Sequence, residues 1–292
     1  MTTKVQKEPK SPMPGQTQQP PGQEHQMEPR PRYHAPLYQG AGKLRDKVAL
    51  ITGGDSGIGR AVAVLYAREG ADVAIVYLPQ EDADAQETRL AVEKEGRKCL
   101  LLPGDVSSSA FCTTAVEQTV QTFGKLDILV NNAAYQMRQE KLEDITDEQL
   151  EYTFRTNIFG YFYMARAALP NLKAGSAIIN TGSITGLEGN VTLLDYAATK
   201  GAIHAFTKSL AQNVVNRQIR VNCVAPGPVW TPLIPISGSA QQTRKHGQGT
   251  PMGRPAQPEE IAPAFVFFAS EADSSYITGE VLTLLGGNVT AA

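Results

Sequence analysis

Short apolar runs alternate with helical stretches from residue 46 almost to the end of the chain. The apolar runs lie at 47–52, 72–77, 99–105, 126–132, 176–183, 219–227 and 280–287. Stretches with apolar residues at helical spacing separate them, at 58–70, 80–95, 108–123, 147–169, 195–216 and 258–270. Continuous apolar strands that alternate with helices indicate a parallel sheet covered on both faces. We therefore predict an α/β fold with a doubly wound, seven-stranded parallel sheet and helices on both of its faces.

Residues 1–42 lack this alternation. They hold eight of the 19 prolines, many glutamines and almost no apolar residues. Such a segment buries too little apolar surface to offset the entropy lost on ordering. We predict a Pro/Gln-rich flexible arm at 1–42, either a free tail or partly docked on the body or on a neighbouring subunit. A single domain is expected at 43–292.

Composition narrows the classes of function. The chain of 292 residues is 41% apolar with a net charge of −2, so no excess of positive charge suggests nucleic acid or an anionic membrane as partner. No apolar run approaches the roughly 20 residues that span a bilayer. The arm resembles neither a secretory signal nor a transit peptide. Three scattered cysteines without metal-ligand spacing fit a reducing compartment, and we expect a cytoplasmic protein without a metal.

Residues suited to ligand binding follow the predicted strands directly. In a doubly wound sheet, ligands bind outside the carboxyl ends of the strands. The residues at those ends are Thr52-Gly53, Tyr77, Asp105, Asn131-Asn132, Ser183 and Pro226-Gly227. The sequence therefore predicts one ligand cleft at this edge of the sheet.

The first of these strand ends carries a glycine-rich loop. "TGGDSGIGR" at 52–60 has glycines at 53, 57 and 59, and the last two open a helix. Glycine permits a tight turn there, and the free N–H groups and dipole of a helix N-terminus favour a phosphate. No Gly-Lys-Ser/Thr follows, which excludes the phosphate loop of nucleotide hydrolases. The position of the loop favours nucleotide binding over a structural turn.

Six motifs in order resemble the short-chain dehydrogenase/reductase family, in its single-domain branch. They are Thr-Gly-x-x-x-Gly-x-Gly from Thr52, "GDV" at 104–106, "NNAA" at 131–134, Asn157 in "RTNIFG", Ser183 with Tyr196-x-x-x-Lys200, and "PGPVWT" at 226–231. The resemblance covers about 46 to 287, and Ala134 stands where the family usually has Gly. The arm and the stretches "GGDSGIGR", "VYLP" and "LDYAATK" look like the glucose/ribitol dehydrogenase-like subgroup of bacterial oxidoreductases.

The resemblance implies a Rossmann-type sheet and a reaction in which hydride transfer interconverts an alcohol and an aldehyde or ketone. Tyr196 would be the general acid/base. A Tyr and a Lys four residues apart meet on any helix, but here Lys200 would stabilise the phenolate and lower a pKa that is ordinarily near 10. Ser183 would bind the carbonyl oxygen where charge develops. Asn157, a poor helix former, would mark a kink holding a water that relays protons from Lys200. The predicted catalytic residues are Asn157, Ser183, Tyr196 and Lys200, and substrate contacts are assigned to Ser183 and Tyr196.

The resemblance also assigns the residues that would bind NAD or NADP. They are Gly53, Asp55, Ser56, Gly57, Ile58, Gly59, Tyr77, Leu78, Asp105, Val106, Asn132, Ala133, Tyr196, Lys200, Pro226, Gly227, Val229 and Thr231. At "VYLPQED" neither an acid for the ribose nor a base for a 2′-phosphate stands at the end of the second strand. Asp55, Glu81 and Asp82 favour NAD slightly, so the choice stays open with a small preference for NAD.

The remaining features concern substrate and assembly. The Pro/Gly-rich stretch 232–254 suggests a flexible lid, and small aldehydes, ketones and polyols all remain possible substrates. Trp230 either lines the substrate site or packs in the core, whereas His204 and Cys223 are expected to be packing residues. Because helices 147–169 and 195–216 are strongly apolar, and because the family pairs them across a two-fold axis, we expect a homotetramer of D2 symmetry.

Two rival functions are considered. A catalytically silent dinucleotide-binding sensor or scaffold usually lacks the Tyr, Lys or Ser, all of which are present here. Nucleotide-sugar epimerases and dehydratases share Tyr-x-x-x-Lys but have another glycine spacing and an additional C-terminal domain. The residues favour the oxidoreductase.

Overall fold

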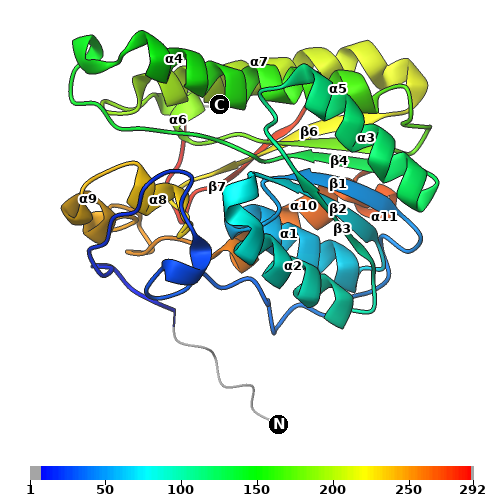
Figure 1. Cartoon of the computed structure of the whole chain (residues 1–292), viewed down its shortest axis with the longest axis horizontal. Coiled ribbons are helices and arrows are strands. Elements are labelled where there is room, and N and C mark those ends of the chain that lie inside the picture. Colours follow the sequence, from blue (N-terminus) through cyan, green and yellow to red (C-terminus); the bar gives the residue numbers. More distant parts are fainter. Residues whose placement is uncertain (1–7, 291–292) are drawn as a thin grey trace.

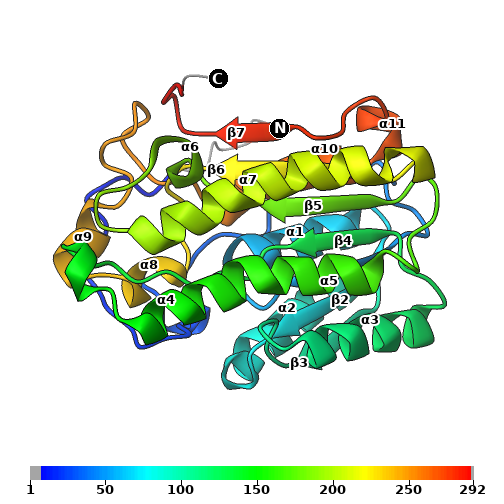
Figure 2. The same ribbon diagram turned by 90° about the horizontal axis from the view of Figure 1, so that it is seen from above.

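Seven parallel strands form one twisted sheet in the computed structural model, which describes residues 8–290 (Figure 1). The strand order is β3-β2-β1-β4-β5-β6-β7, and Figure 2 shows the labelled strands β7, β6, β5, β4, β2 and β3 following one another across the sheet. Their bounds are β1 Val48–Thr52, β2 Asp72–Tyr77, β3 Cys99–Pro103, β4 Ile128–Asn131, β5 Ala177–Thr181, β6 Arg220–Pro226 and β7 Val281–Leu284. The predicted fold class and all seven predicted strands are confirmed, with slightly shorter bounds.

Helices cover both faces of the sheet (Figure 1). One face packs against α1, α2 and α10, and the other against α3, α5 and α7. The helices are α1 Gly57–Arg68, α2 Asp82–Lys94, α3 Ser109–Phe123, α4 Asp147–Phe154, α5 Gly160–Ala168, α6 Thr185–Glu188, α7 Leu194–Val214, α8 Leu233–Ile236, α9 Ala240–Lys245, α10 Pro258–Ala269 and α11 Glu271–Ser274. Short 3-10 turns lie at Glu24–Gln26, Pro79–Glu81, Leu142–Asp144 and Val215–Arg217. Strands β1, β5 and β6 are buried along their whole length, as expected for a sheet covered on both sides.

The stretch 147–169 is interrupted in the middle. A π-helical turn at Arg155–Phe159 joins α4 to α5. The sequence predicted a local irregularity at Asn157, and this prediction is confirmed. A π-turn inserts one residue into the helix and re-aims its side chains, and such turns are frequent at functional sites.

The stretch 232–254 contains short helices rather than an unpatterned loop. Helix α8 begins right after Pro232, and α9 begins after Ser239, whose hydroxyl accepts the Gln242 N–H while the Gln242 side chain accepts the Ser239 N–H. This reciprocal capping satisfies two N–H groups that helix ends otherwise leave unpaired. Capping and not apolar spacing marks the start of α9. The spacing of apolar residues in the sequence therefore did not predict this helix.

Residues 8–42 lie against the body, beside α8 and α9 and along α1 (Figure 1). Met13 and Met27 form a buried cluster with Trp230. The Trp230 indole N–H donates to the Pro29 carbonyl over 2.8 Å. Of the alternatives that the sequence left open, residues 8–42 follow the docked arm and not the free tail, because Met13 and Met27 are buried and the arm makes specific polar contacts. The division of the chain at residue 42 stays a prediction.

Between residues 8 and 290, no helix combines the length and apolarity needed to cross a membrane. Within that range no three His, Cys, Asp or Glu side chains come together as a metal site.

Candidate active site

A cleft with a volume of about 610 Å³ opens at the carboxyl ends of the strands. It has the size that small-molecule sites usually have. Of the predicted site residues, Gly59 and Asn157 do not line it, and the others do: Gly53, Asp55, Ser56, Gly57, Ile58, Tyr77, Leu78, Asp105, Val106, Asn132, Ala133, Ser183, Tyr196, Lys200, Pro226, Gly227, Val229 and Thr231. The strand-end rule therefore located the cleft correctly.

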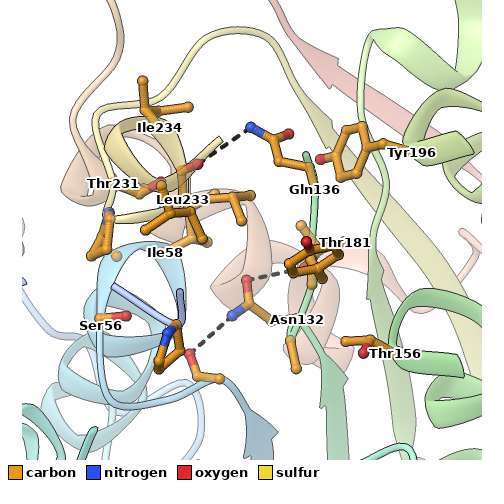
Figure 3. Close-up of a pocket in the computed structure, with 18 of the residues that line it drawn as sticks. Ser56, Ile58, Asn132, Gln136, Thr156, Thr181, Tyr196, Thr231, Leu233 and Ile234 are labelled. Carbon is orange, nitrogen blue, oxygen red and sulfur yellow. Dashed lines mark hydrogen bonds between the residues drawn. The ribbon is translucent and has the colours of Figure 1, made fainter. Parts of the chain in front are cut away.

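The glycine loop between β1 and α1 forms one end of the cleft. Gly53 and Gly57 have φ angles of +62° and +51°, which L side chains rarely adopt. A Cβ on Gly59 would lie 1.9 Å from the Gly53 carbonyl oxygen, so Gly59 permits close packing behind the loop. The Asn132 amide donates to the Thr52 and Gly53 carbonyls over 3.1 and 3.0 Å, and Figure 3 shows Asn132 beside the loop. A tight loop that exposes a helix N-terminus fits the pyrophosphate of a dinucleotide.

The end of the cleft near β2 is acidic. Asp55 and Glu81 line the cleft, and burial raises the pKa of both carboxyls. The Glu81 carboxylate accepts the Leu78 N–H over 3.0 Å. Asp82, by contrast, accepts the Tyr77 hydroxyl over 2.7 Å and is not among the lining residues. No Lys or Arg lines this end within the described residues; the two cations of the cleft wall are Arg138 and Lys200.

Tyr196 and Lys200 lie together on α7 at the opposite wall of the cleft. Figure 3 shows the Tyr196 hydroxyl pointing into the cleft. The Lys200 ammonium lies 5.4 Å from the centre of the Tyr196 ring and donates to the Thr181 carbonyl over 2.7 Å. The Ser183 hydroxyl lies in the wall of the same cleft and is close enough to Tyr196 to lower the pKa of the phenol. Phenol, hydroxyl and ammonium thus converge where β5 ends and α7 begins.

The pKa of Tyr196 shifts upward in this structure, whereas the sequence predicted a lowered pKa. Burial raises the pKa of Tyr196 to about 12, although the neighbouring Ser183 hydroxyl acts in the other direction. Burial also lowers the pKa of Lys200 to about 8. The prediction of an acidified phenol was wrong for this state because both side chains are buried, and burial disfavours the charged form of each.

Asn157 supports the site without lining the cleft. Its side chain accepts the Tyr135 N–H over 2.8 Å and donates to the Tyr135 carbonyl over 2.9 Å. The amide also donates to the Thr199 hydroxyl over 3.0 Å. Asn157 therefore ties the chain after β4 to the helix that carries Tyr196 and Lys200, and the water relay stays a prediction.

His204 and Cys223 are packing residues, and one of them touches the site. The Ser183 N–H donates to His204 Nε2 over 3.4 Å. A Cβ on Gly182 would lie 2.4 Å from that nitrogen and 2.7 Å from the Cys223 sulfur. Burial lowers the pKa of His204 to about 4, so the ring is neutral and can accept this bond at physiological pH.

The sequence analysis did not identify several residues that line the cleft, some of them after β4 and others in the arm. Trp230 does not line the cleft, which settles its two readings in favour of the core. The additional lining residues include Pro20, Pro21, Gln136, Arg138, Thr185, Asn190, Leu193, Ile236 and His246. Gln136 and Arg138 follow β4 closely, so the strand-end rule could have found them, whereas nothing in the arm's composition pointed to Pro20 and Pro21. Gln136 reaches towards α8 and donates to the Leu233 carbonyl over 3.4 Å (Figure 3).

Relatives share nearly the whole chain. An uncharacterized oxidoreductase, YhdF, of Bacillus subtilis (strain 168) is 56% identical over 91% of this chain and 92% of the relative. The glucose and ribitol dehydrogenase of Daucus carota is 50% identical, covering 92% of this chain and 94% of its own. The chloroplastic NADPH-dependent aldehyde reductase 1 of Arabidopsis thaliana is 49% identical, covering 93% and 96%.

The names of two solved structures of the same architecture mention NADP and NADH, respectively. A short chain dehydrogenase from Burkholderia cenocepacia J2315 in complex with NADP has a TM-score of 0.78 and 31% identity, covering 84% of this chain and 98% of its own. The NADH-dependent reductase A1-R′ responsible for alginate metabolism has a TM-score of 0.77 and 33% identity, covering 86% and 100%. The small preference for NAD inferred from the sequence finds no support in these relatives.

A family description also matches most of the chain, from the glycine loop to the last strand. The description reads Enoyl-(Acyl carrier protein) reductase and covers residues 53–288. Glycine loop, Ser183, Tyr196 and Lys200 converge on one cleft of a seven-stranded parallel sheet, and the relatives share that sheet over most of their length. The chain therefore belongs to the short-chain dehydrogenase/reductase family and is an oxidoreductase of that family.

Proposed function

We propose that this protein interconverts an alcohol and an aldehyde or ketone, with NAD or NADP as the hydride carrier and Tyr196 as general acid/base. The observation that carries the proposal is the position of the Tyr196 hydroxyl, which faces the same cleft as the glycine loop and Ser183. A bound nicotinamide would donate or accept the hydride. Every other task falls to side chains of this protein.

Ser183 and Tyr196 would hold the carbonyl oxygen of the substrate from two sides. As hydride reaches the carbonyl carbon, negative charge develops on this oxygen, and hydrogen bonds to it become stronger. Tyr196 then transfers its proton to the oxygen, which completes the alcohol. In the reverse direction the Tyr196 phenolate removes the proton of the alcohol, and Lys200 stabilises that phenolate.

Lys200 also has a positioning task. Its bond to the Thr181 carbonyl fixes the ammonium between the end of β5 and α7. A positive charge at this place would favour the phenolate over the phenol. Asn157 holds α7 through Thr199, which keeps Tyr196 in register with the cleft.

The part of the cleft lined by Gln136, Arg138, Thr185, Leu193 and Ile236, which we call the substrate end, has polar and apolar sides. Gln136, Arg138 and Thr185 contribute polar groups, whereas Leu193 and Ile236 are apolar. A small carbonyl compound with further hydroxyl groups fits such a lining, in line with the names of the aldehyde reductase and the glucose and ribitol dehydrogenase. We also propose a cytoplasmic location, because Cys99, Cys112 and Cys223 are all free, as a reducing compartment requires.

Turnover of a panel of aldehydes, ketones and polyols with NADH, NADPH, NAD⁺ and NADP⁺ tests the proposal. Tyr196→Phe should lower kcat by about 10²- to 10⁴-fold, because it removes the proton donor. Dinucleotide affinity, measured by titration calorimetry, should change by less than about twofold in this variant.

Tyr276→Phe is the matched control, since Tyr276 is fully exposed and does not line the cleft. Its activity should equal that of the wild type. Dinucleotide binding without turnover of any compound would instead favour the silent sensor or scaffold.

A further inference from the structure

The arm encloses one buried charge on α1, the guanidinium of Arg60. Arg60 is fully buried, so its charge must be compensated inside the protein. Its Nη1 lies 2.7 Å from Glu24 Oε1, and its Nη2 lies 3.3 Å from Asp84 Oδ1. The Tyr33 ring, also part of the arm, covers the guanidinium at 4.9 Å. The arm therefore supplies both a counter-charge and an aromatic face to Arg60.

The other oxygen of Glu24 reaches the glycine loop. The Gly57 N–H donates to Glu24 Oε2 over 2.6 Å. Gly57 is the first residue of α1, where the helix itself offers the N–H no acceptor. The Glu24 carboxyl thus bridges Gly57 and Arg60 across the first turn of α1.

Asp84 holds the backbone of Glu24 and His25 in place. The Glu24 N–H donates to Asp84 Oδ2 over 2.7 Å, and the His25 N–H donates to Asp84 Oδ1 over 3.1 Å. Asp84 lies on α2 and is buried. The bridge therefore connects the arm, α1 and α2 through buried groups, and it is not a surface ion pair of small effect.

The same arm segment reaches the cleft. Pro20 and Pro21 line it together with Ser56, Gly57 and Ile58. Further along the arm, the Gln18 N–H donates to the Pro235 carbonyl over 3.0 Å, beside α8. The arm therefore spans from the segment over the substrate end to the glycine loop.

We propose that Glu24 is a positioning residue for the dinucleotide, an inference that rests on the proposed function. Its carboxyl fixes Gly57 and Arg60, so that the glycine loop has its binding geometry before the dinucleotide arrives. With the Gly57 N–H satisfied by Glu24, the next N–H of the helix, that of Ile58 in the cleft wall, is available to a phosphate. A loop ordered in advance binds more tightly, because less entropy is lost on binding.

Electrostatics alone predicts the opposite effect. Asp84 and Glu87 lie beside Arg60 on α1, and Asp55 lies just before the helix, so removing the Glu24 carboxylate would reduce repulsion of an anionic pyrophosphate. A variant without Glu24 would then bind the dinucleotide more tightly. The sign of the change therefore separates positioning from simple charge repulsion.

Titration calorimetry of Glu24→Ala with NAD⁺ and NADP⁺ tests the proposal. The dissociation constant should rise by about 10- to 100-fold for the dinucleotide that the wild type binds, which corresponds to the loss of one or two charge-assisted bonds. In turnover assays KM for the dinucleotide should rise while kcat at saturation stays within about twofold, since Glu24 does not touch the reacting atoms. Glu28→Ala, an exposed carboxylate in the same arm, should leave both quantities unchanged.

Hydrogen exchange provides a readout without turnover. Coupling between two sites is reciprocal, so dinucleotide binding should slow exchange at the amides of Glu24, His25 and Gly57 in the wild type and in Glu28→Ala. Glu24→Gln keeps the size of the side chain, so dinucleotide binding can be measured with this variant if Glu24→Ala unfolds. It loses the ion pair with Arg60 and should also weaken binding.

Unchanged or tighter binding by both Glu24 variants would overturn the inference, as would unchanged exchange in the arm of the wild type. The proposed function would survive either result. A wild-type protein that binds neither dinucleotide would overturn the proposed function, and this inference with it.

Discussion

At Tyr196 and Lys200, burial opposes the charged forms that the proposed reaction requires. The sequence was enough to single out this pair, because Tyr-x-x-x-Lys follows Ser183 at the family's interval. The direction of the pKa shift could not, since it depends on how completely α7 and the end of β5 bury both groups. In the same way, the role of His204 as acceptor for the Ser183 N–H depends on the missing Cβ of Gly182.

These shifts give the two directions of the proposed reaction different pH profiles. Alcohol oxidation needs the Tyr196 phenolate, and a pKa of about 12 keeps the phenol protonated at neutral pH. The kcat/KM for oxidation should therefore rise by about one log unit per pH unit between about pH 6 and 8. Carbonyl reduction uses the protonated phenol and should be flat over this range.

Initial rates in both directions, in buffers of constant ionic strength, provide the measurement. Any residual oxidation by Tyr196→Phe should lose the slope. A wild-type oxidation rate that is independent of pH would contradict the assignment of Tyr196 as the base.

At the scale of elements, regular helices and strands were predicted well and the irregular segments were not. Apolar spacing located the sheet and its main helices, and the poor helix propensity of Asn157 pointed to the π-turn at Arg155–Phe159. The docking of the arm depends on single contacts to residues about 200 positions away, such as Pro29 with Trp230. Periodicity carries no information on such contacts. Movement of residues 232–254 as a lid stays a prediction.

Met27 tests whether the arm is docked in solution. Met27→Ala should lower the free energy of unfolding by about 2–5 kcal/mol, because it leaves a cavity against Met13 and Trp230. Urea titration followed by Trp230 fluorescence measures this, and the only Trp of the chain lies at the contact itself. Leu37→Ala, in an arm side chain that is 68% exposed, should change stability by less than about 0.5 kcal/mol. Equal effects of the two substitutions would mean that the arm is not docked.

The surface of the whole molecule bears on its assembly. Phe159 on the π-turn and Phe162 on α5 are 42% and 49% exposed. The Phe162 ring packs on Phe206 of α7 at 4.1 Å, so these side chains form one apolar surface over both helices. Apolar surface of this kind favours association of subunits, and the homotetramer stays a prediction.

Light scattering should give a mass of about four times the 31.4 kDa chain at micromolar concentration. Phe162→Glu should lower this mass to about half, since it places charge in the predicted interface of helices 147–169 and 195–216 and leaves any other interface of a D2 tetramer intact. Leu90→Glu is the control: Leu90 is 61% exposed on α2, outside the predicted interfaces. A wild-type monomer would refute the prediction.

The long reach of the arm has a consequence for biosynthesis. Residues 8–42 leave the ribosome before their partners Trp230, Pro235 and Arg244, which are made more than 180 residues later. Contacts so distant along the chain form slowly, and here they cannot form at all until β6 and the segment after it have been synthesised. Residues 8–42 can therefore dock there only after that segment has been synthesised, which makes docking of the arm a late step of folding.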